Sequence, residues 1–353
     1  MIVVNYGKEI AKTTYEALKA SDIDTFLDVA FTVALKPNLV TARPPDGGAT
    51  THTEVLEGII QYLRDYGIQN VKIIESSQVG ESTKRAYKAA GYEALSARHK
   101  VPLIELKDDR TTRLTYKNYS MDIYNQALNC DFLINVPVLK GHSQTRLTCC
   151  MKNLKGCIPD TDKRRFHSQG IEGPVAALNA LLKTGYCVVD GICGDLSFEE
   201  GGNPIEANRV IAGRDPVTVD SYCAQLIGYN PDDIKHVAFA RDWGLGEYFS
   251  ADTSLIELNT QNKPKREAKS RLTRDRYSDM VEEDAACSAC YAALVYGLHK
   301  LRGRAGESGK IHIGQGFKGV KREGFGVGSC TSGFTRCVQG CPPKAIDIID
   351  ALR

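Results

Sequence analysis

The chain has 353 residues and a formal net charge of +2, from 45 basic and 43 acidic side chains. This balance, without a polybasic tail, excludes the basic footprint of a nucleic-acid-binding protein, and no apolar stretch reaches the ~18 residues that span a membrane. The chain begins MIVVNYGKEI, without the apolar core of a signal peptide, so we expect a cytoplasmic, reducing location. In that setting its 12 cysteines indicate metal or redox chemistry rather than structural disulfides.

Residues 1–260 read as alternating strands and helices of one domain. Thr51 and Glu54 form a capping box before a helix that ends at Gly67, and a second helix is expected around 82–90. Apolar runs without polar alternation predict strands at 31–35, 71–75, 131–139, 186–190 and 209–213. Such runs are typical of strands buried on both faces, so the sequence predicts an α/β fold with a mostly parallel sheet flanked by helices.

Polar residues follow several of these strands, and functional residues of such sheets gather at strand ends. Each alone is more often a turn or a cap than a functional group. Together they predict a site that combines substrate-binding Lys36, Asn38 and Lys140 with catalytic His142, Asp190 and Asp215.

The stretch 140–167 carries seven Lys or Arg and two His against two Asp. A solvated surface loop would explain this composition. An anion-binding loop would also explain it, and then Lys152, Asn153 and Lys155 would bind a small phosphate or carboxylate substrate. His167 joins His142 as a candidate proton donor, because histidine changes charge near neutral pH.

Residues 261–284 are almost wholly polar, which indicates a linker or a solvated helix, and residues 285–353 are expected to form a small α/β cluster-binding domain. Cysteines two residues apart can hold one metal centre from a single turn, and later cysteines complete the set. The preferred ligands of a 4Fe-4S cluster are Cys287, Cys290, Cys330 and Cys341. Cys337 either replaces Cys330 or is a free thiol, and structural zinc is the main alternative metal.

An ordered set of motifs over about residues 30–250 resembles the "domain of unknown function 362" family: Lys36-Pro-Asn38, LINVPVLKGHS, MKNLKG, VVDG, GRDPVTVD and GLG. The resemblance implies an iron–sulfur protein of anaerobic bacteria or archaea, often with a ferredoxin module. The usual two-cluster ferredoxin string is missing here. The tail's Gly340-Cys-Pro-Pro is instead similar to the cluster loop of the small subunit of respiratory complex I, which implies a single cluster.

These observations favour an iron–sulfur enzyme, a reductase or other oxidoreductase that acts on a small anionic substrate held by the 140–167 loop. An electron carrier or cluster-handling protein is one alternative. A non-redox lyase or dehydratase is another, but it needs an open iron position, and the five tail cysteines favour full ligation. A ferredoxin-like electron donor is an expected partner, a homodimer stays open, and neither nucleic acid nor membrane is expected.

Overall fold

The computed structural model describes residues 1–168, 170–269, 277–301 and 309–353. The chain divides into two compact units. The large unit comprises 1–141, 147–163 and 172–270, and the small unit comprises 142–146, 164–171 and 271–353. The predicted linker, 261–284, includes residues 270–276, which lie outside the described residues.

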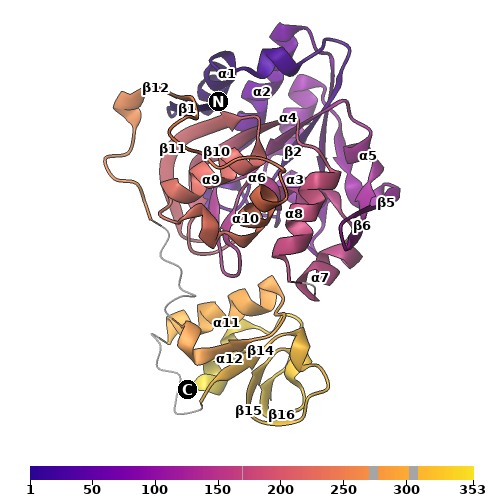
Figure 1. The fold of residues 1–353 in the computed structure, drawn as a ribbon, viewed down its shortest axis with the longest axis vertical. Coiled ribbons are helices and arrows are strands. Elements are labelled where there is room, and N and C mark those ends of the chain that lie inside the picture. The colour runs from indigo at the N-terminus through magenta and orange to yellow at the C-terminus, as the bar shows by residue number, and fades with distance from the viewer. Residues whose placement is uncertain (169, 270–276, 302–308) are drawn as a thin grey trace. The chain divides into compact units, whose positions relative to one another are not determined.

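An eight-stranded sheet forms the centre of the large unit, with the strand order β12-β1-β11-β10-β7-β2-β3-β4 (Figure 1). The pairings from β10 through β7, β2 and β3 to β4 are parallel, as is β1 with β12, while β11 runs antiparallel to both its neighbours. The predicted α/β class with a mostly parallel sheet is therefore confirmed. The strands are β1 (Ile2–Tyr6), β2 (Thr32–Pro37), β3 (Asn70–Glu75), β4 (Leu103–Glu105), β7 (Phe132–Val136), β10 (Tyr186–Asp195), β11 (Pro204–Gly213) and β12 (Leu255–Leu258).

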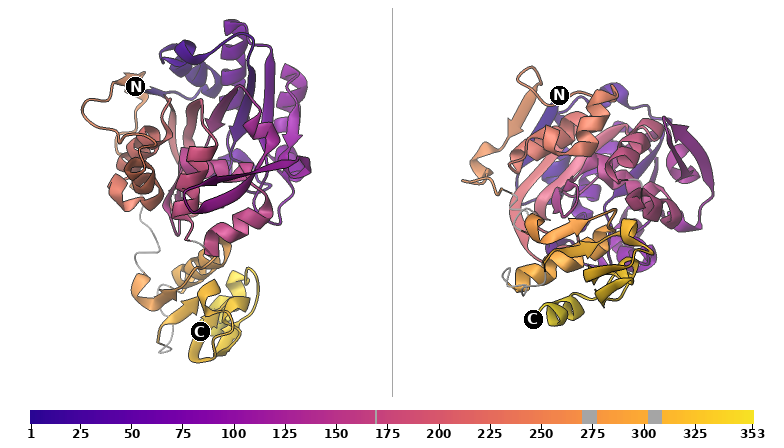
Figure 2. Two further views of the ribbon diagram at one scale, coloured as in Figure 1. Left: turned by 45° about the vertical axis from the view of Figure 1, so that its right-hand side comes forward. Right: turned by 60° about the horizontal axis from the view of Figure 1, so that its bottom comes forward.

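Helices cover both faces of this sheet (Figure 2). On one face α1 and α2 pack together and α4 packs on α2, over a core that includes Val33, Leu35, Ile73 and Ile134. A second group of helices packs together and consists of α6, α8, α9 and α10. The helices of this unit are α1 (Ile10–Lys19), α2 (Thr53–Tyr66), α3 (Thr83–Ala89), α4 (Tyr92–His99), α5 (Asn125–Leu128), α6 (Cys150–Asn153), α8 (Glu172–Leu181), α9 (Pro216–Leu226) and α10 (Lys235–Asp242).

Two short hairpins stand outside the main sheet, β5 (Thr111–Tyr116) with β6 (Tyr119–Tyr124) and β8 (Lys140–His142) with β9 (Arg146–Thr148). Helix α7 (Asp160–Ser168) follows the second of them. The 140–167 stretch that was read as a loop therefore contains a hairpin and two helices.

The start of α2 differs from the predicted capping box. The helix begins at Thr53 with His52 as its N-cap and has no side-chain cap. The Thr51 hydroxyl instead accepts the Asn38 N–H (2.8 Å) and donates to the Val136 carbonyl (2.8 Å). The capping-box prediction is wrong because this hydroxyl bridges two strand ends.

The small unit has a parallel four-stranded sheet, ordered β13-β14-β15-β16, and two helices that pack together. Leu294, Leu298 and Ile348 are buried on these helices. The elements are β13 (Val281–Glu283), α11 (Ser288–Lys300), β14 (Ile311–Ile313), β15 (Arg322–Val327), β16 (Phe334–Val338) and α12 (Ala345–Leu352).

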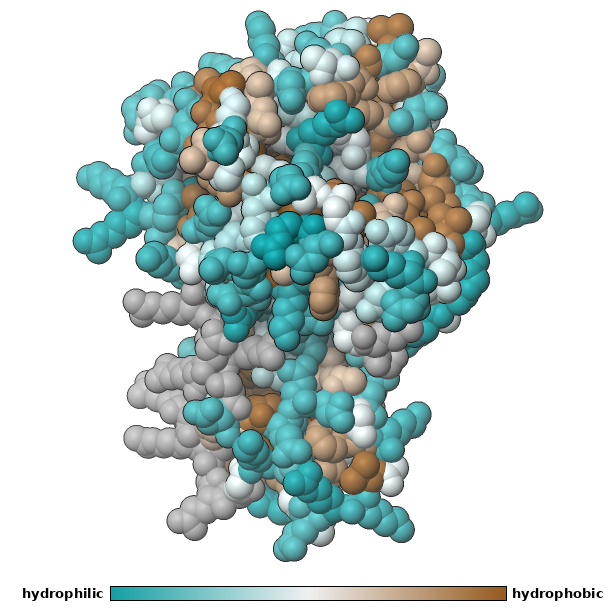
Figure 3. Space-filling model, viewed as in Figure 1, coloured by the Kyte–Doolittle hydropathy of each residue, from teal (hydrophilic) through white to brown (hydrophobic). Residues whose placement is uncertain are grey.

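The face drawn in Figure 3 mixes hydrophilic side chains with separate hydrophobic patches. Among the described residues, no helix combines the length and the apolar character needed to cross a bilayer.

Candidate functional site

A buried ion pair joins the carboxyl ends of β2 and β3. Lys36 Nζ lies 2.8 Å from Glu75 Oε2 and also donates to the Pro37 carbonyl and to Asn153 Oδ1. Glu75 in turn accepts the backbone N–H groups of Leu39 and Ser76. Because an ammonium has three N–H donors, these partners occupy Lys36 fully, and its role in this structure is to hold the strand ends.

Asn153, at the end of α6, ties that helix to the same edge of the sheet. Its Nδ2 donates to the carbonyls of Lys36 and Pro37 and to Asn135 Oδ1 (2.8 Å). Asn135 Nδ2 donates to the Cys150 carbonyl (2.7 Å). The predicted substrate-binding residues Lys36 and Asn153 thus lie together, but their polar atoms form hydrogen bonds with each other and with neighbouring protein groups.

Lys140 is fully buried and donates to Asn38 Oδ1 (3.2 Å) and to the carbonyls of Ala49 (2.9 Å) and Glu199 (3.0 Å). Burial lowers the pKa of Lys140 to about 8, although the Glu199 carboxylate acts in the opposite direction. Through these hydrogen bonds the Lys140 side chain links the loop after β2 to the loop between β10 and β11.

Lys152 is also buried, and its Nζ donates to Glu199 Oε1 (2.6 Å) and Thr148 Oγ1 (3.3 Å). Burial lowers the pKa of Lys152, and the Glu199 carboxylate opposes that shift. Lys155 lies half-buried in the short 3-10 helix η4 (Leu154–Cys157) that follows α6. Of the two lysines in the MKNLKG motif, Lys152 is buried and faces a carboxylate, and Lys155 is partly exposed.

His52 and Asp190 form a second buried pair at this edge. Asp190 Oδ2 accepts hydrogen bonds from both the backbone N–H and Nδ1 of His52, each at 2.8 Å. Burial acts to lower the pKa of His52, but the charge and hydrogen bond of Asp190 outweigh it and raise that pKa to about 11. The Nε2 atom faces Cys193 Sγ (3.9 Å) and a carboxylate oxygen of the exposed Asp46 (3.7 Å). Asp190 therefore keeps His52 as an imidazolium with Nε2 directed at an anion.

The sequence analysis missed His52, whose partner lies 138 residues away in the chain. Asp215, which was predicted to be catalytic, is the N-cap of α9. Its oxygens accept the N–H groups of Val217 and Glu247 and the hydroxyl of Thr218.

The two candidate proton donors lie in segments of the small unit. His142 ends β8, and its Nδ1 accepts the backbone N–H groups of Gln144 (3.0 Å) and Thr145 (3.1 Å). Because Nδ1 is an acceptor, the proton of the neutral ring is on Nε2. His167 lies half-buried on α7.

Four tail cysteines come from three loops of the small unit. Cys287 is the N-cap of α11 and Cys290 lies in its first turn, while Cys330 lies in η9 (Ser329–Thr331) and Cys341 follows β16. Burial and then the neighbouring thiols of Cys287, Cys341 and Cys330 raise the pKa of Cys290 to about 12. The other three thiols therefore lie close enough to Cys290 to influence its ionisation.

Cys337 has different partners. Its sulfur lies 3.3 Å from both Thr331 Oγ1 and Gln339 Nε2. The α11 N-terminus has no side-chain cap, so its first N–H groups and positive dipole end favour a thiolate at Cys287 or Cys290. Four thiols of this kind fit the donor set of an iron–sulfur cluster.

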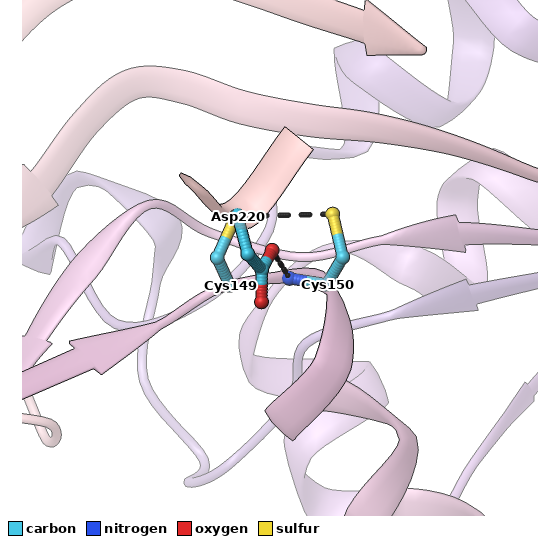
Figure 4. Close-up of side chains that lie close together, drawn as sticks. All are labelled: Cys149, Cys150 and Asp220. Carbon is cyan, nitrogen blue, oxygen red and sulfur yellow. Dashed lines mark hydrogen bonds between the residues drawn. The ribbon is translucent and has the colours of Figure 1, made fainter. Parts of the chain in front are cut away.

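The large unit contains a further group that the sequence analysis did not identify. The potential ligand atoms of Cys149, Cys150 and Asp220 all lie within 4.8 Å of one another, and all three residues are buried (Figure 4). The doubled cysteine at 149–150 was the available signal in the sequence. Thiol and carboxylate ligands at this spacing could hold a metal ion.

The fold and these groups define an α/β protein with the side chains of a metal-binding protein. The family model "Domain of unknown function (DUF362)" matches residues 33–225, and the chain belongs to this family. The chain is 25% identical, over 224 residues, to the thylakoid-associated protein sll1697 of Synechocystis, covering 60% of this chain and 68% of that protein. It also resembles the lactate racemase apoprotein of Thermoanaerobacterium thermosaccharolyticum, with a TM-score of 0.43 and 9% identity over 64% of this chain. The match spans 57% of that chain, and a likeness at this level gives no functional information.

Proposed function

We propose that this protein is an iron–sulfur oxidoreductase that reduces a small anionic substrate, a phosphate or a carboxylate. The observation that supports the proposal is the placement of Cys287, Cys290, Cys330 and Cys341 in one unit, with Cys287 and Cys290 at the N-terminus of α11. A 4Fe-4S cluster bound there would supply single electrons, and a ferredoxin-like protein is the expected donor. Cys341 is exposed, which gives such a donor access to one edge of the site.

The substrate half of the proposal rests on two buried cations of the large unit, the His52 imidazolium and the Lys152 ammonium. Each is matched by a carboxylate from a surface loop, Asp46 for His52 and Glu199 for Lys152. The two loops are joined, since the Gly202 N–H donates to the Gly47 carbonyl at 3.0 Å. Each loop carboxylate therefore occupies a position where the oxygen of a bound anion could contact the buried cation.

In this proposal a substrate anion takes the place of one loop carboxylate. Two acceptors within the described residues engage Lys152 Nζ, which leaves its third N–H for a ligand. Lys155 adds a further positive charge from the same segment. Lys36, Asn38, Lys140 and Asn153 position these groups through their buried contacts.

A reduced anion must also be protonated, and we assign that step to a histidine. His142 presents Nε2–H, because its Nδ1 accepts two backbone hydrogen bonds. His167 is the second candidate. Asp190 acts through His52, by keeping it charged and oriented.

An electron carrier is the second candidate function, favoured by the exposed position of Cys341. The two functions differ in their need for the large unit's cations. With anaerobically purified protein, Glu199→Gln should tighten binding of inorganic phosphate or of a dicarboxylate in calorimetry, because it removes a competing carboxylate. Glu93→Gln, an exposed change on α4, is the matched control. Absence of any anion binding in both variants would leave only the carrier.

A further inference from the structure

The large unit buries four thiols and one carboxylate in one place, and the proposed oxidoreductase function uses none of them. Cys149 precedes α6 and Cys150 opens it, Cys187 lies on β10, and Asp220 and Cys223 lie on α9. All five residues have zero exposure. Three separate segments of the chain therefore bring metal-ligand side chains into the core.

The distances fit a single bound ion. Cys149 Sγ lies 3.8 Å from Cys150 Sγ, and an Asp220 carboxylate oxygen lies within 4.8 Å of both sulfurs. Two thiolates bound at about 2.3 Å to one tetrahedral zinc stand about 3.8 Å apart. Figure 4 shows the Asp220 carboxylate beside the two thiols. The two sulfurs thus already have the spacing of two ligands, and the carboxylate oxygen lies near enough to become the third.

A fourth ligand is available from the same helix face. Cys223 follows Asp220 by three residues on α9, and residues three apart in a helix lie on one side of it. Helix α9 also packs on α6, which Cys149 precedes and Cys150 opens. Cys223 therefore lies on the face of α9 that carries Asp220.

The surroundings of the Asp220 carboxyl group suit a bound cation. Its oxygens accept the backbone N–H groups of Cys150 (2.7 Å) and Met151 (3.0 Å). Across residues 1–168, 170–269, 277–301 and 309–353, no Lys, Arg or His side chain forms an ion pair with Asp220. A buried carboxylate without a cationic partner is costly, and a bound metal ion would compensate it.

We propose that Cys149, Cys150, Asp220 and Cys223 together hold one tetrahedral divalent metal ion, for which zinc is the best chemical match. Four protein ligands leave no open position, so the site is structural and fastens α6 to α9. The two backbone N–H groups that Asp220 accepts orient its carboxylate toward the ion. Cys187 is the remaining buried thiol of this group and is not needed as a ligand.

The test uses the full-length chain with Cys287, Cys290, Cys330 and Cys341 all changed to Ser, so that the tail cannot hold metal. Expressed with zinc and analysed by plasma mass spectrometry, this protein should retain about one zinc per chain. Asp220→Asn or Cys149→Ser in the same background should lower that content at least about tenfold. Cys130→Ser, a change outside the group, is the matched control and should retain the zinc.

A second measurement covers the case in which the core variants do not fold. Zinc removed from the tail-substituted protein and replaced by Co²⁺ should give a thiolate-to-cobalt charge-transfer absorption. A folded tail-substituted protein that holds neither zinc nor Co²⁺ would overturn the proposal, as would zinc content unchanged by Asp220→Asn. Because the tail cysteines are absent throughout, this result is independent of the iron–sulfur cluster.

Discussion

Replacing Asp190 with asparagine is the sharpest test of the buried His52–Asp190 pair in the large unit. The change keeps the shape of the side chain but removes the charge that faces the imidazolium of His52 at 2.8 Å. Removing one partner of a buried ion pair costs about 3–5 kcal/mol, because the other group must then stay charged without compensation or give up its proton. We expect a loss of that size in the free energy of unfolding, measured by urea denaturation at pH 7.

The pH dependence gives a second readout. The pKa of His52 in the folded protein is raised to about 11, from an ordinary value near 6.5. Its stabilisation is therefore fully present below pH 6.5 and is lost as the pH rises through 11. In Asp190→Asn, burial still lowers the pKa of His52 while Cys193 acts in the opposite direction, so that pKa should fall well below 11 and the imidazole signals in NMR should report the change.

Asp46→Asn is the matched control, because Asp46 is exposed and lies 3.7 Å from the other ring nitrogen of His52. An exposed partner contributes about 1 kcal/mol or less. If His52 titrates near 6.5 in the unaltered protein, or if Asp190→Asn costs no more than Asp46→Asn, the reasoning is refuted.

Three further substitutions probe neighbouring groups. Lys36→Met should cost about 3–5 kcal/mol in urea denaturation by leaving Glu75 buried without its cation, and adding Glu75→Gln should recover much of it; no recovery would contradict the pairing. Thr51→Val removes a hydroxyl that bridges two strand ends and should cost about 1–3 kcal/mol, again by denaturation. Lys155→Ala should weaken phosphate binding in calorimetry by about 1–3 kcal/mol, whereas the exposed Lys84→Ala should not; equal effects would argue against an anion site.

Strands buried on both faces were predictable because they appear in the sequence as continuous apolar runs. The runs at 31–35, 71–75 and 131–139 became β2, β3 and β7. Ile2–Tyr6, a similar apolar run, forms β1 although no strand was predicted there. It also gave no direction for β11, because the pattern within one strand does not reveal whether its neighbours run parallel or antiparallel.

For the residues at the strand ends, the sequence predicted their position but not their contacts. Residue type and position placed Lys36 and Lys140 at the correct edge of the sheet. Whether their N–H groups are open to a ligand depends on contacts with Glu75, Ala49 and Glu199, which are distant in sequence. Sequence reasoning can therefore locate such a cation, but only the fold shows that it is already engaged.

The Cys149–Cys150 pair was overlooked for a related reason. Free cysteine is among the most buried residue types and usually acts as a small apolar side chain. What distinguishes this pair is Asp220, a carboxylate in the otherwise mostly apolar helix α9 that reaches it across 70 residues of sequence. An aspartate and a cysteine three residues apart in such a helix are a second signal in the sequence, beside the doubled cysteine.

The most direct test of the central claim is the iron content of the full chain after anaerobic purification. The account predicts about four irons per chain and a cluster signal in electron paramagnetic resonance after reduction. Cys290→Ser should abolish both, and Cys337→Ser should leave most of each. Zinc in the tail site and no iron, or an undiminished cluster in Cys290→Ser, would contradict the assignment.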